Sequence, residues 1–119
     1  MKKFLPVTIL VLAALALASS AQAVTPGQRN ALRSAQSYLQ TSAFSKSGLE
    51  QQLEFDHFSR SNARWAVDHV RVSWFAEAVK AAKSYLQTSS FSRQDLIDQL
   101  EFDGFTPSQA AYGVRKAYR

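Results

Sequence analysis

The 119-residue sequence contains no cysteine and only two histidines. Without cysteine, the chain forms no disulfide, offers no thiolate to a metal ion and has no thiol for attachment of a lipid. The histidines, His57 and His69, do not have HxxxH-like spacing, so we expect no metal site. No serine stands in a Gly-x-Ser-x-Gly setting either. We therefore predict that the protein is not an enzyme and uses no cofactor.

The sequence also lacks an apolar run long enough to cross a membrane. Apolar residues dominate positions 4–18, roughly 15 residues, where a spanning helix needs about 20. Two lysines precede this run, and the small-x-small sequence at 21–23 follows it, the pattern that signal peptidase reads. These features predict a signal peptide over residues 1–23, cleaved before Val24. We expect the mature chain to have no transmembrane helix and to be periplasmic, associated with the cell envelope or secreted.

Basic residues only slightly outnumber acidic ones. The formal net charge is +5, and loss of Lys2 and Lys3 with the signal lowers it by two, to +3. This excess permits attraction to anionic polymers or lipid head groups, but it is not the dense basic face of a nucleic-acid-binding protein. Helix-turn-helix spacing raises DNA binding as an alternative, yet an exported protein does not meet the chromosome. We expect no nucleic-acid partner and place on a solvated face the residues Arg60, Arg64, Arg71, Arg115, Lys116 and Arg119.

The central feature of the chain is an internal repeat. Residues 35–58 recur as residues 82–105, an offset of 82 − 35 = 47 positions. The match includes polar residues, such as Gln-Thr-Ser at 40–42 and 87–89, which a shared apolar pattern alone would not reproduce. The chain is therefore a duplicated module, with a first unit over residues 24–72 and a second over residues 73–119.

Each unit is predicted to contain three short helices, and no stretch alternates with the period of a strand, so the fold class is all-α. Serine or threonine precedes each apolar-periodic segment as an N-cap. The leucines at 49 and 53, and at 96 and 100, are expected to be buried, and the repeated aromatic residues are expected in the core rather than in a ligand site. Residues 70–73 contain no Gly or Pro, which predicts a short, stiff connection. The predicted caps are Thr25, Ser45, Ser59, Ser73, Ser92 and Thr106.

The second unit resembles the repeat of the host cell surface-exposed lipoprotein (Ltp) family. The resemblance rests on Trp74 and on residues 82–86, 91–100, 104–106 and 109–114, and the first unit, which ends with residues 63–70, matches less closely in the same frame. It implies two helix-turn-helix units displayed outside the cytoplasmic membrane. Founding members of the family are prophage-encoded superinfection-exclusion proteins, which block entry of another phage's DNA by binding its tail tape-measure protein. This chain departs from the pattern because it has no lipobox cysteine.

The resemblance and the signal together predict an exported binding module that blocks injection of phage DNA. Two alternatives remain: an envelope-associated structural or adhesion module that binds anionic polymer or lipid, and a small hydrolase that uses Glu101 and Asp103. We expect those carboxylates, like Glu54 and Asp56, to end the second helices and to face solvent. If the partner surface follows the repeat, its candidate residues are Lys46, Glu50, Glu54, Asp56, Arg93, Ile97, Glu101 and Asp103. Ile97 is either a contact or buried by a different helix rotation.

Overall fold

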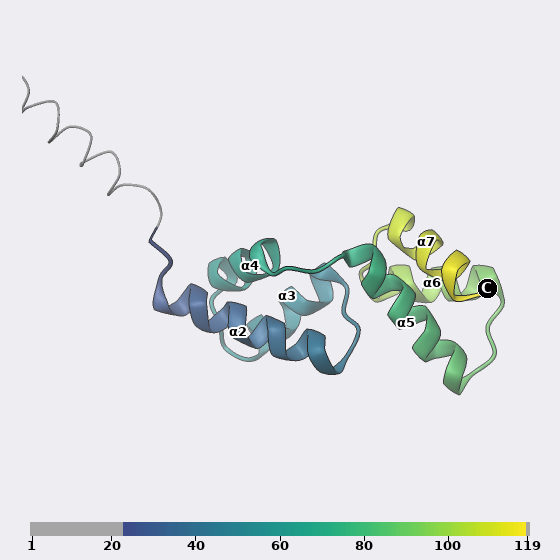
Figure 1. Ribbon diagram of the computed structural model, residues 1–119, viewed down its shortest axis with the longest axis horizontal. Coiled ribbons are helices and arrows are strands. Elements are labelled where there is room, and N and C mark those ends of the chain that lie inside the picture. Colours follow the sequence, from purple (N-terminus) through teal and green to yellow (C-terminus); the bar gives the residue numbers. More distant parts are fainter. Residues whose placement is uncertain (1–22, 119) are drawn as a thin grey trace, which may run out of the picture.

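A computed structural model describes residues 23–118 (Figure 1). The signal peptide predicted over residues 1–23 lies outside this range except for its last residue. Every regular element described is an α-helix, so the all-α prediction is confirmed. The first unit contains α2 (Pro26–Thr41), α3 (Lys46–Phe55) and α4 (Arg60–His69), and the second contains α5 (Trp74–Thr88), α6 (Arg93–Phe102) and α7 (Pro107–Ala117).

The helices begin where the capping residues predict. The Thr25 hydroxyl accepts the Gln28 amide N–H at 3.1 Å, and the Gln28 side chain accepts the Thr25 amide N–H at 2.9 Å. Thr106 and Gln109 form the same capping box at the start of α7. Such a pair satisfies two of the amide groups that a helix start leaves without partners. The remaining helices are capped by the predicted serines, Ser45, Ser59, Ser73 and Ser92.

The second helix of each unit ends in a Schellman motif. Its left-handed residue is His57 (φ 74°) in the first unit and Gly104 (φ 104°) in the second. Glycine adopts this conformation without steric cost, whereas a residue with a side chain is strained there. The next residue is a phenylalanine whose amide closes the motif at 3.1 Å in both units, Phe58 to the Leu53 carbonyl and Phe105 to the Leu100 carbonyl.

Each unit has its own small hydrophobic core. Both leucine pairs are fully buried, as predicted, and they pack against small residues of the first and third helices. The expectation that the repeated aromatic residues all lie in the core is wrong for Phe55 and Phe102, which are 78% and 86% exposed. Each follows a buried leucine by two residues, and a turn of about 200° along the helix carries it to the outer side.

A short connection joins the units. Helix α4 ends at His69 and α5 begins at Trp74, so residues 70–73 are the whole connection (Figure 1). Residues near the joint also contact the neighbouring core, because Trp74 packs against the first core and Ala43 packs against the second. The predicted shortness of the connection is confirmed.

The third helix of the second unit approaches the first helix very closely. A Cβ built on Gly113 would lie 2.6 Å from the Ala78 carbonyl oxygen, well inside van der Waals contact. Residue 113 corresponds to Ala66 in the first unit, where the third helix accommodates a methyl group. Glycine therefore sets the distance between α5 and α7.

Replacing Gly113 by alanine is expected to destabilise the protein. The added methyl group must displace the backbone of Ala78, so the cost is expected in the upper part of the usual overpacking range of about 1–3 kcal/mol, above the helix-propensity gain of about 1 kcal/mol. The matched control, Ala66→Gly, is expected to cost about 1 kcal/mol. Urea unfolding followed by circular dichroism measures both variants, and an unchanged or raised stability of Gly113→Ala would contradict the close packing of α5 and α7.

Candidate partner-binding surface

Three ion pairs cross from α3 to α4 in the first unit. Their members stand four residues apart on each helix, so that the two antiparallel helices are bridged at regular intervals. Exposed pairs contribute about 0.2–1 kcal/mol each, and a network of them also fixes side-chain positions. We call this set the ion-pair ladder. It consists of Lys46–Asp68 (2.7 Å), Glu50–Arg64 (3.1 Å) and Glu54–Arg60 (4.0 Å).

Three of the predicted binding residues belong to the ladder and are ion-paired within their own unit. Lys46, Glu50 and Glu54 all have partners on α4. Two of the arginines considered for DNA binding, Arg60 and Arg64, are the partners of glutamates. The charges on this side of the first unit are therefore largely neutralised by each other.

The corresponding positions of the second unit do not form a ladder. Adding 47 to each position gives Arg93 with Arg115, Ile97 with Ala111, and Glu101 with Pro107. We call the first five of these residues, Arg93, Ile97, Glu101, Ala111 and Arg115, the α6–α7 seam. Ile97 is half-buried against the second core, Ala111 is half-buried, and Glu101 is exposed. An apolar centre flanked by unlike charges thus replaces the ladder.

Aromatic rings lie against the cations of the seam, Arg93 and Arg115, and against Lys116, which is next to the seam. The Arg93 guanidinium lies 4.5 Å from the centroid of the Tyr118 ring. Arg115 lies 5.4 Å from the Tyr112 ring centroid, and Lys116 lies 5.6 Å from the same centroid. Such contacts stabilise by about 0.5–1 kcal/mol at exposed sites. Because a ring cancels no charge, these cations remain available to an anionic group on a partner.

The last two predicted residues, Asp56 and Asp103, cap the ends of α3 and α6 and accept hydrogen bonds from tyrosines. The Tyr38 hydroxyl donates to Asp56, and the Tyr85 hydroxyl donates to Asp103 at 2.6 Å. Burial, followed by the bond to Asp103, raises the pKa of Tyr85 to about 12. For Tyr38, the hydrogen bond to Asp56 is the main cause of a raised pKa.

The expectation that all four helix-end carboxylates face solvent is only partly right. Asp56 and Glu101 are exposed, but Glu54 and Asp103 are half-buried. Glu54 is turned toward Arg60, and Asp103 is drawn in by its bond to the hydroxyl of Tyr85. The partial burial of both side chains results from partners on neighbouring helices.

The sequence interpretation missed an acidic outer face on α6. Asp95, Asp98 and Phe102 follow one another at i, i+3 and i+7, which places them on one side of the helix, and all three are exposed. In the first unit the corresponding residues are Gly48, Gln51 and Phe55. The signal was present in the spacing, because this face lies opposite the buried leucines.

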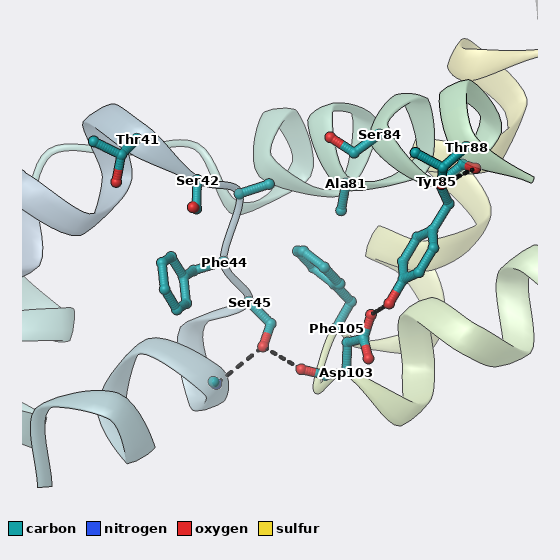
Figure 2. Close-up of a pocket in the computed structure, with 12 residues that line it drawn as sticks. Thr41, Ser42, Phe44, Ser45, Ala81, Ser84, Tyr85, Thr88, Asp103 and Phe105 are labelled. Atoms are coloured by element: carbon teal, nitrogen blue, oxygen red, sulfur yellow. Dashed lines mark hydrogen bonds between the residues drawn. The ribbon is translucent and has the colours of Figure 1, made fainter. Parts of the chain in front are cut away.

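A groove of about 590 Å³ lies between the units, beside their direct contact (Figure 2). Phe44 and Ser45 line one side, and Ala81, Tyr85, Asp103 and Phe105 line the other. Figure 2 shows the Ser45 hydroxyl directed at the carbonyl of Asp103, to which it donates at 2.6 Å. The second unit also supplies Glu77, a nearly buried carboxylate that accepts the amide of Phe44 at 3.0 Å. Neither Ser45 nor Glu77 was expected to be buried.

Within residues 23–118 no three His, Asp or Glu side chains come close enough together to hold a metal ion. His69 instead stacks on Trp65, with ring centroids 4.1 Å apart. In the same range, no helix has both the length and the apolar character that crossing a membrane requires.

Comparisons with known proteins agree with the fold. A model of the host cell surface-exposed lipoprotein family matches residues 27–70 and again residues 73–116. A solved structure, that of Ltp, a superinfection exclusion protein from the Streptococcus thermophilus temperate phage TP-J34, is similar with a TM-score of 0.74 and 35% sequence identity. The similarity covers 78% of this chain and 97% of that one. The search of curated proteins found no match.

The tyrosine–aspartate bond predicts an alkaline loss of stability. Because the folded-state pKa of Tyr85 is about 12, above the ordinary 10.0, its contribution is complete below pH 10 and is lost as the pH rises through 12. Tyr85→Phe is expected to lower the free energy of unfolding by about 1–2 kcal/mol below pH 10 and to flatten the decline above it. Thermal unfolding at a series of pH values tests this, and an equally steep decline in the variant would refute it.

Proposed function

This chain belongs to the host cell surface-exposed lipoprotein family, and we propose that it is a superinfection-exclusion protein that acts in the cell envelope. The observation that carries the proposal is the similarity, over two tandem units, to a superinfection exclusion protein, with 97% of that chain covered. The activity proposed is non-catalytic: the protein blocks injection of phage DNA by binding a component of the incoming phage.

Location in the envelope is part of the proposal. Residues 1–23 have the charge, apolar run and cleavage pattern of a signal peptide, and the family is named for exposure at the cell surface. The sequence contains no cysteine to which a lipid is attached in lipoproteins. The mature chain therefore acts from the periplasm, from the envelope or after secretion.

The proposed partner is the tail tape-measure protein of the phage, and its proposed contact is the α6–α7 seam. The seam differs from the matching part of the first unit in one respect that favours binding: its charged groups have no ion-pair partner among the described residues. Ile97 provides an apolar centre between Arg93 and Glu101. An amphipathic helix offers the complementary layout, with apolar anchors and flanking charges.

The cations of the seam and the adjacent Lys116 also support the alternative function. Arg93, Arg115 and Lys116 lie beside tyrosine rings, a combination that suits an anionic polymer or lipid surface. Binding to such a surface falls steeply with salt, whereas a contact centred on Ile97 depends on it less.

A variant that rebuilds the ladder in the second unit tests the proposed surface. Ile97→Glu combined with Ala111→Arg recreates the Glu50–Arg64 pair at the corresponding positions, so the fold is expected to persist. Binding to the purified tape-measure protein, measured by calorimetry, is expected to weaken about tenfold or more, as for loss of a central interface residue. Exclusion of phage DNA by expressing cells is expected to weaken in parallel, with adsorption unchanged.

The reciprocal change provides the control. Glu50→Ile with Arg64→Ala removes one ladder pair from the first unit and is expected to leave binding and exclusion intact. Equal loss in both variants would contradict the assignment to the second unit. Normal DNA entry into cells expressing the unaltered protein, across a broad panel of phages, would contradict exclusion itself, and salt-sensitive binding to anionic vesicles or cell-wall polymer would then support the alternative.

A further inference from the structure

The two units contact each other through the start of α3 and the end of α6. The hydroxyls of Ser45 and Ser47 donate to the carbonyls of Asp103 and Gly104, at 2.6 and 3.2 Å. A third bond runs from the amide of Phe44 to a carboxylate of the second unit. We call the donor side the helix-start surface (Phe44, Ser45, Ser47, Gly48) and the acceptor side the helix-end surface (Glu77, Asp103, Gly104).

Because the units are repeats, each carries a version of both surfaces. One pair is used inside the chain, which leaves a helix-end surface on the first unit and a helix-start surface on the second. A contact between unlike surfaces leaves one of each free at the ends, so copies with matching free surfaces would add head to tail into rings or open filaments. The free surfaces consist of Asn30, Asp56 and His57 on the first unit, and Phe91, Ser92, Gln94 and Asp95 on the second.

We infer that neither free surface can form this contact, so that no further copy of the chain adds to the pair of units. The acceptor side is closed by His57. A Cβ on Gly104 would lie 2.2 Å from the Ser47 hydroxyl and 2.6 Å from the Ser45 hydroxyl. His57 has a Cβ at the corresponding position, in the same left-handed conformation, and therefore occupies the space that an incoming serine requires.

A second substitution removes the charged acceptor from the first unit. Glu77 is 4% exposed and accepts the backbone amide that precedes the capping serine. Asn30 stands at this position in the first unit and carries no charge. A hydrogen bond to a carboxylate is stronger than one to an amide oxygen, so the incoming helix start loses its strongest acceptor.

The donor side is closed by Asp95. It replaces Gly48, at which a Cβ would lie 3.4 Å from the Asp103 carbonyl oxygen. A carboxylate at this place would face the carbonyl oxygens at the end of another helix and repel both them and the negative end of that helix. Gln94 also replaces the donor Ser47 with a longer side chain. The acceptor residues Glu77 and Gly104 thus occur only in the second unit, and the donor residues Ser47 and Gly48 only in the first, so each chain carries one matching pair of surfaces.

The first experiment makes both free surfaces able to form the contact. The variant Asn30→Glu, His57→Gly, Gln94→Ser, Asp95→Gly gives each free surface the residues of the internal contact. A short linker supplies an effective concentration of about 1 mM or more, so a contact that forms inside the chain is expected to form between chains near that concentration. Translational diffusion measured by NMR up to about 1 mM should show association of the variant and a monomeric unaltered protein. Equal diffusion of the two proteins would overturn the inference.

The second experiment disrupts the contact between the two units of one chain. Glu77→Asn with Gly104→His gives the second unit the residues of the first, where His57 shows that the backbone accommodates histidine. The chain has no cysteine, so spin labels at Gln51→Cys and Gln87→Cys, both exposed positions, report only the distance between units. The distance distribution is expected to be narrow in the unaltered background and broad in the variant, at equal helix content. A distribution that stays equally narrow would overturn the roles of Glu77 and Gly104.

Discussion

The turn at the end of the second helix is the constraint on which the rest of each unit depends. A left-handed residue there reverses the chain, and the amide of the phenylalanine that follows donates to the carbonyl of a buried leucine. The same turn positions the aspartate that receives the tyrosine hydroxyl, and it directs the third helix back along the second. In the second unit its carbonyl groups also receive the serines of the first unit. One local conformation therefore determines the core, the seam and the joint.

Duplication has given two units with one backbone and different surfaces. The first unit uses its charges on itself, because three ion pairs hold α3 to α4. The second unit has no ladder at the corresponding positions, and its α5 and α7 approach each other closely at Gly113. Arg93 and Glu101 have no ion-pair partner among residues 23–118, and the apolar Ile97 lies between them. A division of roles follows, in which the first unit supports the joint and the second presents the proposed binding face.

Local chemistry made much of the fold predictable from the sequence. Capping residues, helix spacing and the buried leucines depend on neighbours within one turn, so Thr25, Ser45 and Leu49 could be placed without a structure. The burial of Glu77 and Ser45 could not, because it depends on contact with residues 33 and 58 positions away. The exposure of Phe102 was predictable from its angular position on the helix, but Phe102 was grouped with the repeated aromatic residues that were expected in the core. The candidate site residues stay a prediction, and the pairing of Lys46, Glu50 and Glu54 with α4 was not foreseen, since it depends on the neighbouring helix.

We propose that the second unit alone presents the surface for a phage tail protein. An NMR titration of the isotopically labelled full chain with the purified tape-measure protein tests this proposal. Shift changes are expected to concentrate at Arg93, Ile97 and Arg115 and their neighbours on α6 and α7, with α3 and α4 unaffected. Shift changes along the ion-pair ladder of the first unit, or none at saturating partner, would contradict it.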